Sequence, residues 1–352
     1  MTLQPTRPRY TIAVTGLNAI DSPGPGVAVI RALREAPGFA VRIIGLSYEA
    51  LEPGIYMHEL VDKTYQIPYP GAGTTALLER LTHVQEHEHL DLLIPNFDAE
   101  LPNFIRLSGR LLVLGIRTFL PSLEQLDQRD KLHLRAFGQA HDLLVPDDEP
   151  VFRLDELRRA GERLGYPLVV KGKFYDATVA HTWEQAQKAF HQLHATWGLP
   201  VIAQEFVAGH EINIAGLGDG AGRLISAVPM RKLYITDKGK AWAGITLEDP
   251  ALLALAEQFV AATHWRGGFE LELMRGSGGE LHIMEINPRF PAWVYLTAAS
   301  GQNQPAALVH LALGEPVAPM QGYAVGRMFI RYAWDLITDN TEFHQISAFG
   351  EL

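Results

Sequence analysis

A carboxylate, an amide and a guanidinium lie within five positions of one another in the sequence LHIMEINPR (281–289). On a β-strand, Glu285 and Asn287 are two residues apart and point to the same face. Carboxylate and amide oxygens are hard ligands that suit Mg²⁺. Arg289 follows the proline that ends the strand, and its guanidinium can hold a phosphate or a carboxylate through two parallel hydrogen bonds. This spacing predicts a site for phosphate groups bound to magnesium.

Two more carboxylates precede this string on a predicted hairpin strand. Glu270 and Glu272, in FELEL (269–273), alternate with apolar residues and therefore share one face. Four oxygen-bearing side chains on adjacent strands could bind two metal ions. The same alternation is typical of the polar outer face of a hairpin, so spacing alone supports both readings equally.

The first 120 residues alternate between strand and helix patterns. Strands are predicted where β-branched and apolar residues run together, and helices where apolar residues recur every three to four positions. This alternation favours right-handed crossovers, so the segment is expected to form an open parallel sheet. The predicted strands are Tyr10–Thr15, Phe39–Leu46, Leu90–Pro95 and Leu111–Gly115, and the predicted helices are Val27–Glu35 and Leu77–His87.

The rest of the chain combines helices with hairpins of period two. A helix that carries Lys131 is expected from Ser122, and a buried strand that ends in a lysine is expected at Pro167–Lys171. Glycine-rich turns join the expected hairpin strands. This order favours an α+β catalytic region after the α/β segment. The other expected helices are Leu154–Leu164 and Trp183–Leu193, and the other expected strands are Val201–Phe206, Glu211–Leu217, Leu224–Pro229, Phe269–Met274 and Leu281–Ile286.

The composition restricts the class of protein. The 352 residues carry a formal net charge of −10 without a basic run, which argues against nucleic acid as the main partner. No apolar run approaches the ~20 residues of a membrane span. The sequence has no cysteine, which excludes disulfides and a cysteine nucleophile and fits a cytoplasmic protein. The first residues lack the cleavage site of a signal peptide, so we interpret them as part of the mature protein.

Four strings occur in the order found in the ATP-grasp superfamily. MEINPR, with the hairpin WRGGFELELMRGSGGELHI before it, resembles the metal-binding end of the carbamoyl phosphate synthetase large chain and of biotin carboxylase. PLVVKGK resembles the strand whose lysine reaches the nucleotide phosphates. QEFVAGHE resembles the hinge that holds adenine, and RDKLHLRAF resembles the segment with the first basic residue. The resemblance covers most of the chain, from about residue 10 to about residue 315.

The resemblance implies a fold and a division into domains. TIAVTG and LDLLIPNFDAELP resemble the domain that precedes the grasp in this superfamily. A Rossmann-like open parallel sheet would therefore be followed by a two-lobed ATP-grasp fold, which gives an α/β and α+β protein. The implied domains are the pre-ATP-grasp domain at residues 1–120, the small lid subdomain at 121–205 and the C-terminal catalytic subdomain at 206–352.

The resemblance also implies roles for individual residues. Lys131 and Lys171 would neutralise the phosphates of ATP, and Arg289 would hold the γ-phosphate or an acyl phosphate, so Lys171 and Arg289 are the catalytic candidates. Glu285 would bridge two Mg²⁺ ions, or two Mn²⁺ ions in their place. The other implied contacts are Asn287 and Glu272 to one ion each, with Glu270 as the alternative to Glu272, main-chain groups of Gln204, Glu205, Phe206 and Val207 to adenine, Glu211 to ribose, and Lys232 to phosphate or substrate.

Several of these residues also fit a purely structural role. Lys131 suits an exposed helix face, Glu211 can cap a turn, and Lys232 can form an exposed pair with Arg231. Lys171 is harder to explain in this way, because burying an unpaired ammonium at the end of an apolar strand is costly.

The implied reaction is the ATP- and Mg²⁺-dependent joining of a carboxylate to an amine through an acyl phosphate. The substrates would be a small-molecule or peptide carboxylate and an amine nucleophile, and a homodimer is the default state for such an enzyme. One feature favours an alternative, a nucleotide-binding homologue without ligase activity. Where the family has a glycine-rich lid, KGKFYDATVAHTWEQA (171–186) has one glycine and the aromatic residues Phe174 and Tyr175.

Three other patterns have weaker links to function. Asp98 and Glu100 follow a strand of the first segment, at the position where open parallel sheets bind ligands. His83 and His87 have the i, i+4 spacing of a zinc pair, but without a third ligand nearby we interpret them as part of an exposed helix face. The turn SPGPG (22–26) resembles a phosphate-cradling turn. The basic and aromatic residues of 327–334 could line a carboxylate pocket, but we interpret them as a packed final strand.

Overall fold

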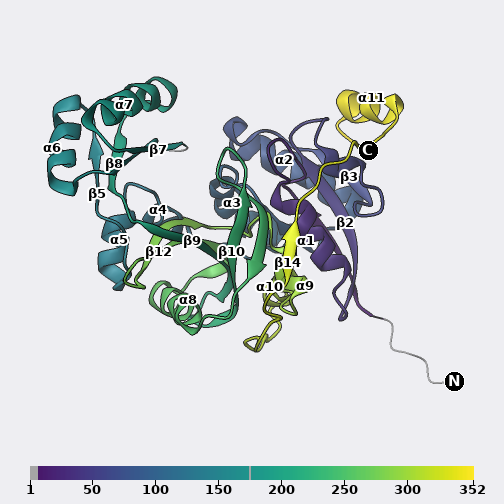
Figure 1. Ribbon diagram of the computed structural model, residues 1–352. Coiled ribbons are helices and arrows are strands. Elements are labelled where there is room, and N and C mark those ends of the chain that lie inside the picture. Colours follow the sequence, from purple (N-terminus) through teal and green to yellow (C-terminus); the bar gives the residue numbers. More distant parts are fainter. Residues whose placement is uncertain (1–6, 174–175) are drawn as a thin grey trace. The chain divides into compact units, whose positions relative to one another are not determined.

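The computed structural model describes residues 7–173 and 176–352 (Figure 1). The chain forms two compact units, of which the first contains residues up to Leu123 together with Ile214–Glu270 and Asn287–Leu352, and the second contains Glu124–Asn213 and Leu271–Ile286. These bounds divide the chain differently from the three expected segments, 1–120, 121–205 and 206–352, which stay a prediction.

The first unit contains a four-stranded parallel sheet. Its strands run in the order β3-β2-β1-β4, with Ile12 of β1 opposite Ile43 of β2 and Leu92 of β4. These three side chains are fully buried, and helix α1 adds Val29 and Leu33 to the same core. The predicted open α/β layer is therefore confirmed. Its elements are β1 Arg9–Val14, α1 Pro25–Arg34, β2 Ala40–Ser47, η1 Pro53–Tyr56, β3 Lys63–Gln66, η2 Pro70–Ala72, α2 Gly73–Glu88, β4 Leu92–Ile94 and α3 Leu101–Val113.

The glycine-rich turn after β1 packs α1 against the sheet. A side chain on Gly26 would place its Cβ 2.1 Å from the carbonyl oxygen of Thr15. Pro25 opens the helix directly after Gly24, which suits a position whose N–H needs no partner. Close packing of helix on strand is thus sufficient to explain the SPGPG pattern.

The strand predicted at Leu111–Gly115 is wrong. Helix α3 continues to Val113, and its buried residues Leu101, Phe104, Leu107 and Leu111 follow a helical period. Leu112 and Val113 are exposed, which a buried strand would not allow. A short apolar run does not by itself distinguish helix from strand. The fourth strand is instead β3, whose four residues KTYQ carry too little apolar signal to be recognised.

The antiparallel hairpins predicted in the second half are present. One six-stranded sheet has the order β13-β12-β9-β10-β11-β14. Helix α8 packs on β10 in the first unit, and the rings of Phe259, Trp265 and Phe269 contact one another in its core. The bounds are β9 Gly209–Asp219, β10 Leu224–Ile235, β11 Ala241–Thr246, α8 Pro250–Thr263, β12 Arg266–Gly276, β13 Leu281–Asn287, α9 Tyr295–Ala299, α10 Gln304–Ala312 and β14 Met328–Ile330.

The second unit is built around a four-stranded antiparallel sheet in the order β5-β8-β6-β7. Figure 1 shows α6 and α7 beside β5 and β8 in teal. Leu157, Phe190 and Leu193 from these helices pack against Val170 and Val201 of the sheet. The elements are α4 Leu123–Gln128, α5 Leu134–His141, β5 Asp148–Val151, α6 Leu154–Leu164, β6 Leu168–Lys171, β7 Ala177–Ala180, α7 Trp183–Trp197 and β8 Val201–Glu205.

The chain returns to the parallel sheet after β14. Helix α11 (Asn340–Phe349) is followed by Leu352, whose main-chain N–H and C=O both bond to Thr64 of β3. The expected final strand is present as β14, and Phe329 packs inward, but Met328 and Ile330 on its other face are largely exposed. No helix in the described ranges is both long enough and apolar enough to cross a membrane.

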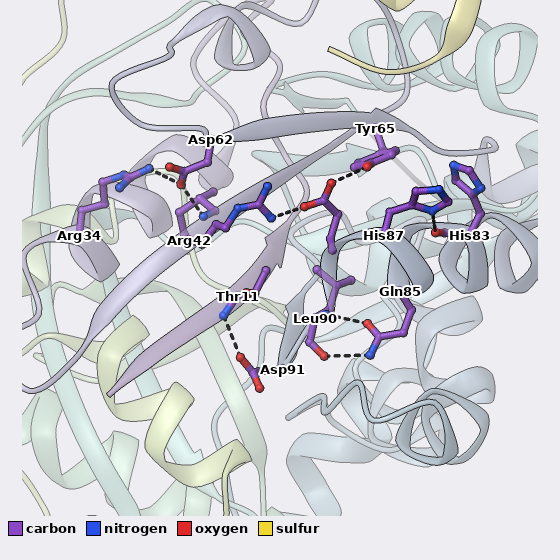
Figure 2. Close-up of polar contacts among 12 residues, drawn as sticks. Thr11, Arg34, Arg42, Asp62, Tyr65, His83, Gln85, His87, Leu90 and Asp91 are labelled. Carbon is purple, nitrogen blue, oxygen red and sulfur yellow. Dashed lines mark hydrogen bonds and ion pairs between the residues drawn. The ribbon is translucent and has the colours of Figure 1, made fainter. Parts of the chain in front are cut away.

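A buried carboxylate ties α2 to the parallel sheet. Tyr65 of β3 and Arg42 of β2, both labelled in Figure 2, bond to one carboxyl group, which the contacts identify as that of Glu88. The Tyr65 hydroxyl donates to Glu88 Oε1 at 2.5 Å, and Arg42 Nη1 pairs with Glu88 Oε2. Burial opposes ionisation of Glu88, but the bonds from Tyr65 and Arg42 hold the pKa of its carboxyl below the ordinary value.

The two histidines of α2 that lie four residues apart both have hydrogen-bond partners within the protein. His87 Nδ1 bonds to the main-chain oxygen of His83 at 2.7 Å (Figure 2), and His83 Nε2 contacts Glu351 Oε1 at 2.8 Å. Among the described residues no third ligand joins them in a metal cluster. We therefore retain the interpretation that His83 and His87 are part of a helix face, and Glu351 is the partner of His83.

Replacing Glu88 with alanine should destabilise the protein by about 3 kcal/mol, because the substitution leaves the buried Tyr65 hydroxyl without an acceptor and Arg42 without a carboxylate. Denaturant unfolding measures this change. The exposed Glu86→Ala on the same helix is the matched control and should stay within about 0.5 kcal/mol of the parent. Equal losses in the two variants would show that Glu88 has no special role.

Candidate active site

Two lysines from different elements of the second unit approach one another. Lys171 is the last residue of β6, as predicted, and it is half-buried. Lys131 lies in the turn between α4 and α5, so the prediction of a helix that carries it is wrong. Asp130 explains the break, because its Oδ1 accepts from the main-chain N–H of Leu132 at 3.0 Å and favours a turn over a continued helix.

Carboxylates surround these lysines. Lys131 Nζ lies 3.6 Å from Glu285 Oε2. Burial, together with the neighbouring charge of Lys131, lowers the pKa of Lys171 to about 8, against the opposite influence of Glu285, Asp148 and Glu272. Four predicted residues of the second unit, Lys131, Lys171, Glu272 and Glu285, are therefore electrostatically coupled.

Asp148 is a member of this cluster that sequence reasoning missed. It opens β5 opposite Gln204 of β8, and its side chain is buried. Burial raises the pKa of Asp148 to about 6, while the charges of Lys171 and Arg135 oppose this rise. The only signal in the sequence is a pair of aspartates between prolines (PDDEP), which is also typical of an exposed loop.

The predicted adenine hinge lies at the end of β8. Gln204 is buried, and Glu205 bonds to Asp147 through both its main-chain N–H, at 2.8 Å, and its Oε2, at 3.1 Å. Phe206 and Val207 follow as half-buried residues outside the strand. The backbone at this point leaves the sheet before Gly209, where β9 begins. Glu211 lies on β9.

The predicted ligands of the first unit are arranged around a buried carboxylate. Asn287 Nδ2 donates to Glu270 Oε2 at 3.1 Å, and Trp293 Nε1 donates to Glu270 Oε1 at 2.7 Å. Both oxygens of Glu270 thus accept hydrogen bonds from the protein. The bond to Glu270 orients the Asn287 amide so that its oxygen, the predicted metal ligand, points away from Glu270. Trp293 had no signal in the sequence pattern.

Arg289 and Lys232 complete the predicted set in the first unit. Arg289 Nε pairs with Asp98 Oδ1 at 2.8 Å, and its Nη1 donates to the Phe290 carbonyl at 3.2 Å. Lys232 Nζ donates to the Gly239 carbonyl at 3.2 Å. The contact of Lys232 lies within its own hairpin, between β10 and β11, whereas Arg289 is held by a residue at the end of the parallel sheet.

The donor set fits a divalent cation that shares its coordination with phosphate oxygens. Glu272 and Glu285 are half-buried, and the Glu285 side chain is 34% exposed. In the described part of the chain no three His, Asp or Glu side chains form a metal cluster by themselves. These two carboxylates of the second unit are too few for Mg²⁺ alone but suit a Mg²⁺ ion that also binds phosphate and water. Phe174 and Tyr175, of the expected lid segment, lie outside the described residues.

Comparisons with known proteins concern the family and the fold. Residues 199–329 match a family described as ATP-grasp in the biosynthetic pathway with Ter operon. Over 119 residues the chain is 34% identical to the D-alanine–D-alanine ligase of Bordetella pertussis, a match that covers 33% of this chain and 38% of that protein. The matched part therefore spans less than two fifths of that relative's length.

Two solved structures resemble the whole chain more fully. Biotin carboxylase from Campylobacter jejuni, in a β,γ-ATP complex, has a TM-score of 0.70 and 16% identity over 90% of this chain and 73% of its own. The biotin carboxylase domain dimer of the Hydrogenobacter thermophilus 2-oxoglutarate carboxylase, with MgADP, ADP and bicarbonate, has a TM-score of 0.67 and 17% identity over 88% of this chain and 70% of its own. At these identities the similarity concerns the fold.

The chain therefore has the ATP-grasp fold, an N-terminal parallel sheet followed by antiparallel sheets, as the sequence predicted. The resemblance seen in its motifs is confirmed by the family match over residues 199–329 and by the fold.

Replacing Lys171 with methionine should stabilise the ligand-free protein while abolishing its stabilisation by ATP. At pH 7 the ammonium is charged in both the folded and the unfolded chain. A pKa lowered to about 8 then means that burial of this charge costs roughly 2–3 kcal/mol, and methionine removes that cost. Thermal unfolding with and without ATP and Mg²⁺ measures both effects.

Lys188→Met, on the exposed face of α7, is the matched control and should change neither quantity. A Lys171→Met protein that melts at a lower temperature without ligand, or that retains the ATP-dependent shift, would contradict the assignment of Lys171.

Proposed function

We propose that the chain is an ATP- and Mg²⁺-dependent ligase that joins a carboxylate to an amine through an acyl phosphate. The cluster of Lys131, Lys171, Glu272 and Glu285 carries this proposal. Two ammonium groups close enough to influence one another favour a polyanion. The carboxylates beside them favour a divalent cation on that polyanion. A magnesium nucleotide meets both requirements.

In this proposal the residues position charges and do not form covalent bonds with the substrate. Lys131 and Lys171 bind phosphate oxygens, and Glu272, Glu285 and Asn287 hold Mg²⁺. When bound, Mg²⁺ neutralises charge that develops on the transferred phosphoryl group. Arg289, which Asp98 holds in place, binds the γ-phosphate and then the acyl phosphate.

In the same proposal, residues of the hinge and of the hairpins contact the nucleotide. Main-chain groups from Gln204 to Val207 contact adenine, and Glu211 accepts from the ribose hydroxyls. Lys232, bonded within its hairpin, would have to turn outward to reach a phosphate. Glu272 is preferred to Glu270 as a metal ligand because both oxygens of Glu270 already accept from Asn287 and Trp293.

The substrate class is inferred from the relatives. The D-alanine–D-alanine ligase match supports a small-molecule or peptide carboxylate and an amine nucleophile, but it spans only 38% of that protein. Two Mg²⁺ ions, with Mn²⁺ as a substitute, and a homodimer are further parts of the proposal, as is the division into a preceding domain, a lid and a catalytic subdomain.

Replacing Glu285 with glutamine tests the metal assignment without knowledge of the substrates. Mg²⁺ should strengthen ATP binding to the parent protein by about tenfold or more, and this enhancement should disappear in Glu285→Gln, since an amide is a weaker Mg²⁺ ligand than a carboxylate. Isothermal titration calorimetry with and without Mg²⁺ measures the ratio. Glu280→Gln, in the turn of the same hairpin, should keep the enhancement. Unchanged Mg²⁺ dependence in Glu285→Gln would remove Glu285 from the site.

The connection after Lys171 favours a second candidate, a nucleotide-binding protein that does not ligate. Strand β7 begins at Ala177, and the main-chain N–H of Gly172 donates to the Asp176 carbonyl at 2.9 Å. Only five residues therefore join β6 to β7, which is short for a segment that covers phosphates. A ligase should release ADP and phosphate with at least one acid–amine pair from a broad panel. Tight binding of ATP·Mg without release from any pair would favour the second candidate.

A further inference from the structure

Three strands of the parallel sheet bring polar and aromatic residues to one edge. Thr15 directly follows β1, Tyr48 directly follows β2, and Asn96 and Phe97 follow β4 by two and three residues. Because β1, β2 and β4 are parallel, their carboxyl ends lie at the same edge, the position where open α/β sheets bind ligands. All of these residues belong to the first unit.

Glu100 is the fully buried centre of this edge. Its Oε1 accepts from Thr15 Oγ1 at 2.5 Å and from the main-chain N–H groups of Asn96 and Phe97 at 2.7 and 3.0 Å. Its Oε2 accepts from the Tyr48 hydroxyl. Burial raises the pKa of Glu100, and these hydrogen bonds act in the opposite direction. The protein thus fixes one carboxyl group at this edge using neutral donors alone.

Glu52 adds a second buried carboxyl group, and one of its oxygens accepts no hydrogen bond from the described residues. Its side chain is only 6% exposed. Oε1 accepts from the main-chain N–H of Tyr48 at 2.7 Å and of Glu49 at 3.3 Å. Oε2 is buried and has no hydrogen-bond partner in the parts of the chain that the structure describes. Burial, with the nearby charges of Glu100 and Glu49, raises the pKa of Glu52 to about 7, and Glu52 in turn raises the pKa of the Tyr48 hydroxyl, so its carboxyl lies beside the same cluster.

Aromatic rings stand beside these carboxyl groups. Tyr48 stacks on Tyr69 with ring centres 5.6 Å apart and an interplanar angle of 21°, and Phe97 lies 6.0 Å from Tyr48. Tyr69 is 54% exposed, and its hydroxyl donates to Glu49 Oε1 at 2.7 Å. One side of the cluster is therefore open to solvent.

The carboxyl groups of the cluster have no lysine or arginine partner within the described residues. Glu49, Glu52 and Glu100 form no ion pair with a lysine or arginine there, and the nearby Asp98 is paired with Arg289. Aromatic faces combined with carboxylates attract organic cations, because the ring quadrupole and the carboxylate charge act in the same direction. A buried carboxyl oxygen without a donor is costly unless a ligand supplies one.

We propose that this edge, formed by Tyr48, Tyr69, Phe97, Glu49, Glu52 and Glu100, binds an organic ammonium group. The N–H donors of the ammonium would meet Glu52 Oε2, and its charge would balance the cluster. The conclusion about substrates rests on the proposed ligase function: at least one of the two substrates carries a positive charge in addition to its reacting group, as amino acids and diamines do.

Cation binding at this edge is testable without ATP. The probe is n-butylammonium, compared with 1-butanol of the same size and with sodium chloride at equal ionic strength, in an NMR titration of the full chain with labelled tyrosines. The ammonium should shift the Tyr48 and Tyr69 resonances in a saturable way and bind about tenfold or more tightly than the alcohol. Equal binding of alcohol and ammonium, or no saturable shift up to high concentration, would overturn the proposal.

Variants separate this site from general effects. Glu52→Gln should weaken ammonium binding about tenfold. Tyr69→Ala, at a largely exposed position, should weaken it several-fold. The control Glu59→Gln, also at an exposed position, should leave ammonium binding unchanged. If Glu52→Gln does not fold, Tyr69→Ala alone decides, and unchanged affinity in that variant overturns the proposal. ATP·Mg binding, measured on the same proteins, should be unaffected. Failure of the ligase function would thus leave ammonium binding intact, whereas turnover that uses only neutral or anionic substrates would overturn the conclusion about substrates alone.

Discussion

The charge of Lys171 constrains the second unit more than any other single feature. Its strand, β6, lies between β8 and β7 and is otherwise apolar, so the ammonium leaves water at the end of a packed sheet. Lys131 adds a second positive charge nearby, and burial and this neighbour together lower the pKa of Lys171. Two like charges held this close destabilise one another, and in the proposed function a bound polyanion offsets that repulsion.

The hairpin β12–β13 shows how one strand pattern yields two roles. Glu270 and Glu272 share a face because they are two residues apart, yet Glu270 is buried and bonded to Asn287 and Trp293, whereas Glu272 is half-buried and coupled to Lys171. In the proposed function the first carboxylate supports a metal ligand and the second is one, although both positions share one face of the strand.

Sequence reasoning succeeded where the signal is local. The alternation on β12 and β13, the apolar run ending in Lys171 and the strand–helix order of the first segment all depend on residues close in the chain, and the structure contains them. Sequence reasoning failed where contacts between residues far apart in the chain determine the local structure. The helical course of Leu111–Val113 depends on which side of α3 meets the core, and the turn that carries Lys131 depends on Asp130. The partners of Glu100 and Glu270 are separated from them by up to 85 residues, and no local sequence pattern predicts such pairs.

The most direct test of the central claim is a crystal structure with a non-hydrolysable ATP analogue and Mn²⁺, in which anomalous scattering locates the metal. The account predicts manganese within coordination distance of Glu272, Glu285 and Asn287, with phosphate oxygens on Lys131 and Lys171. Manganese bound elsewhere, or a nucleotide whose phosphates do not reach either lysine, would contradict it.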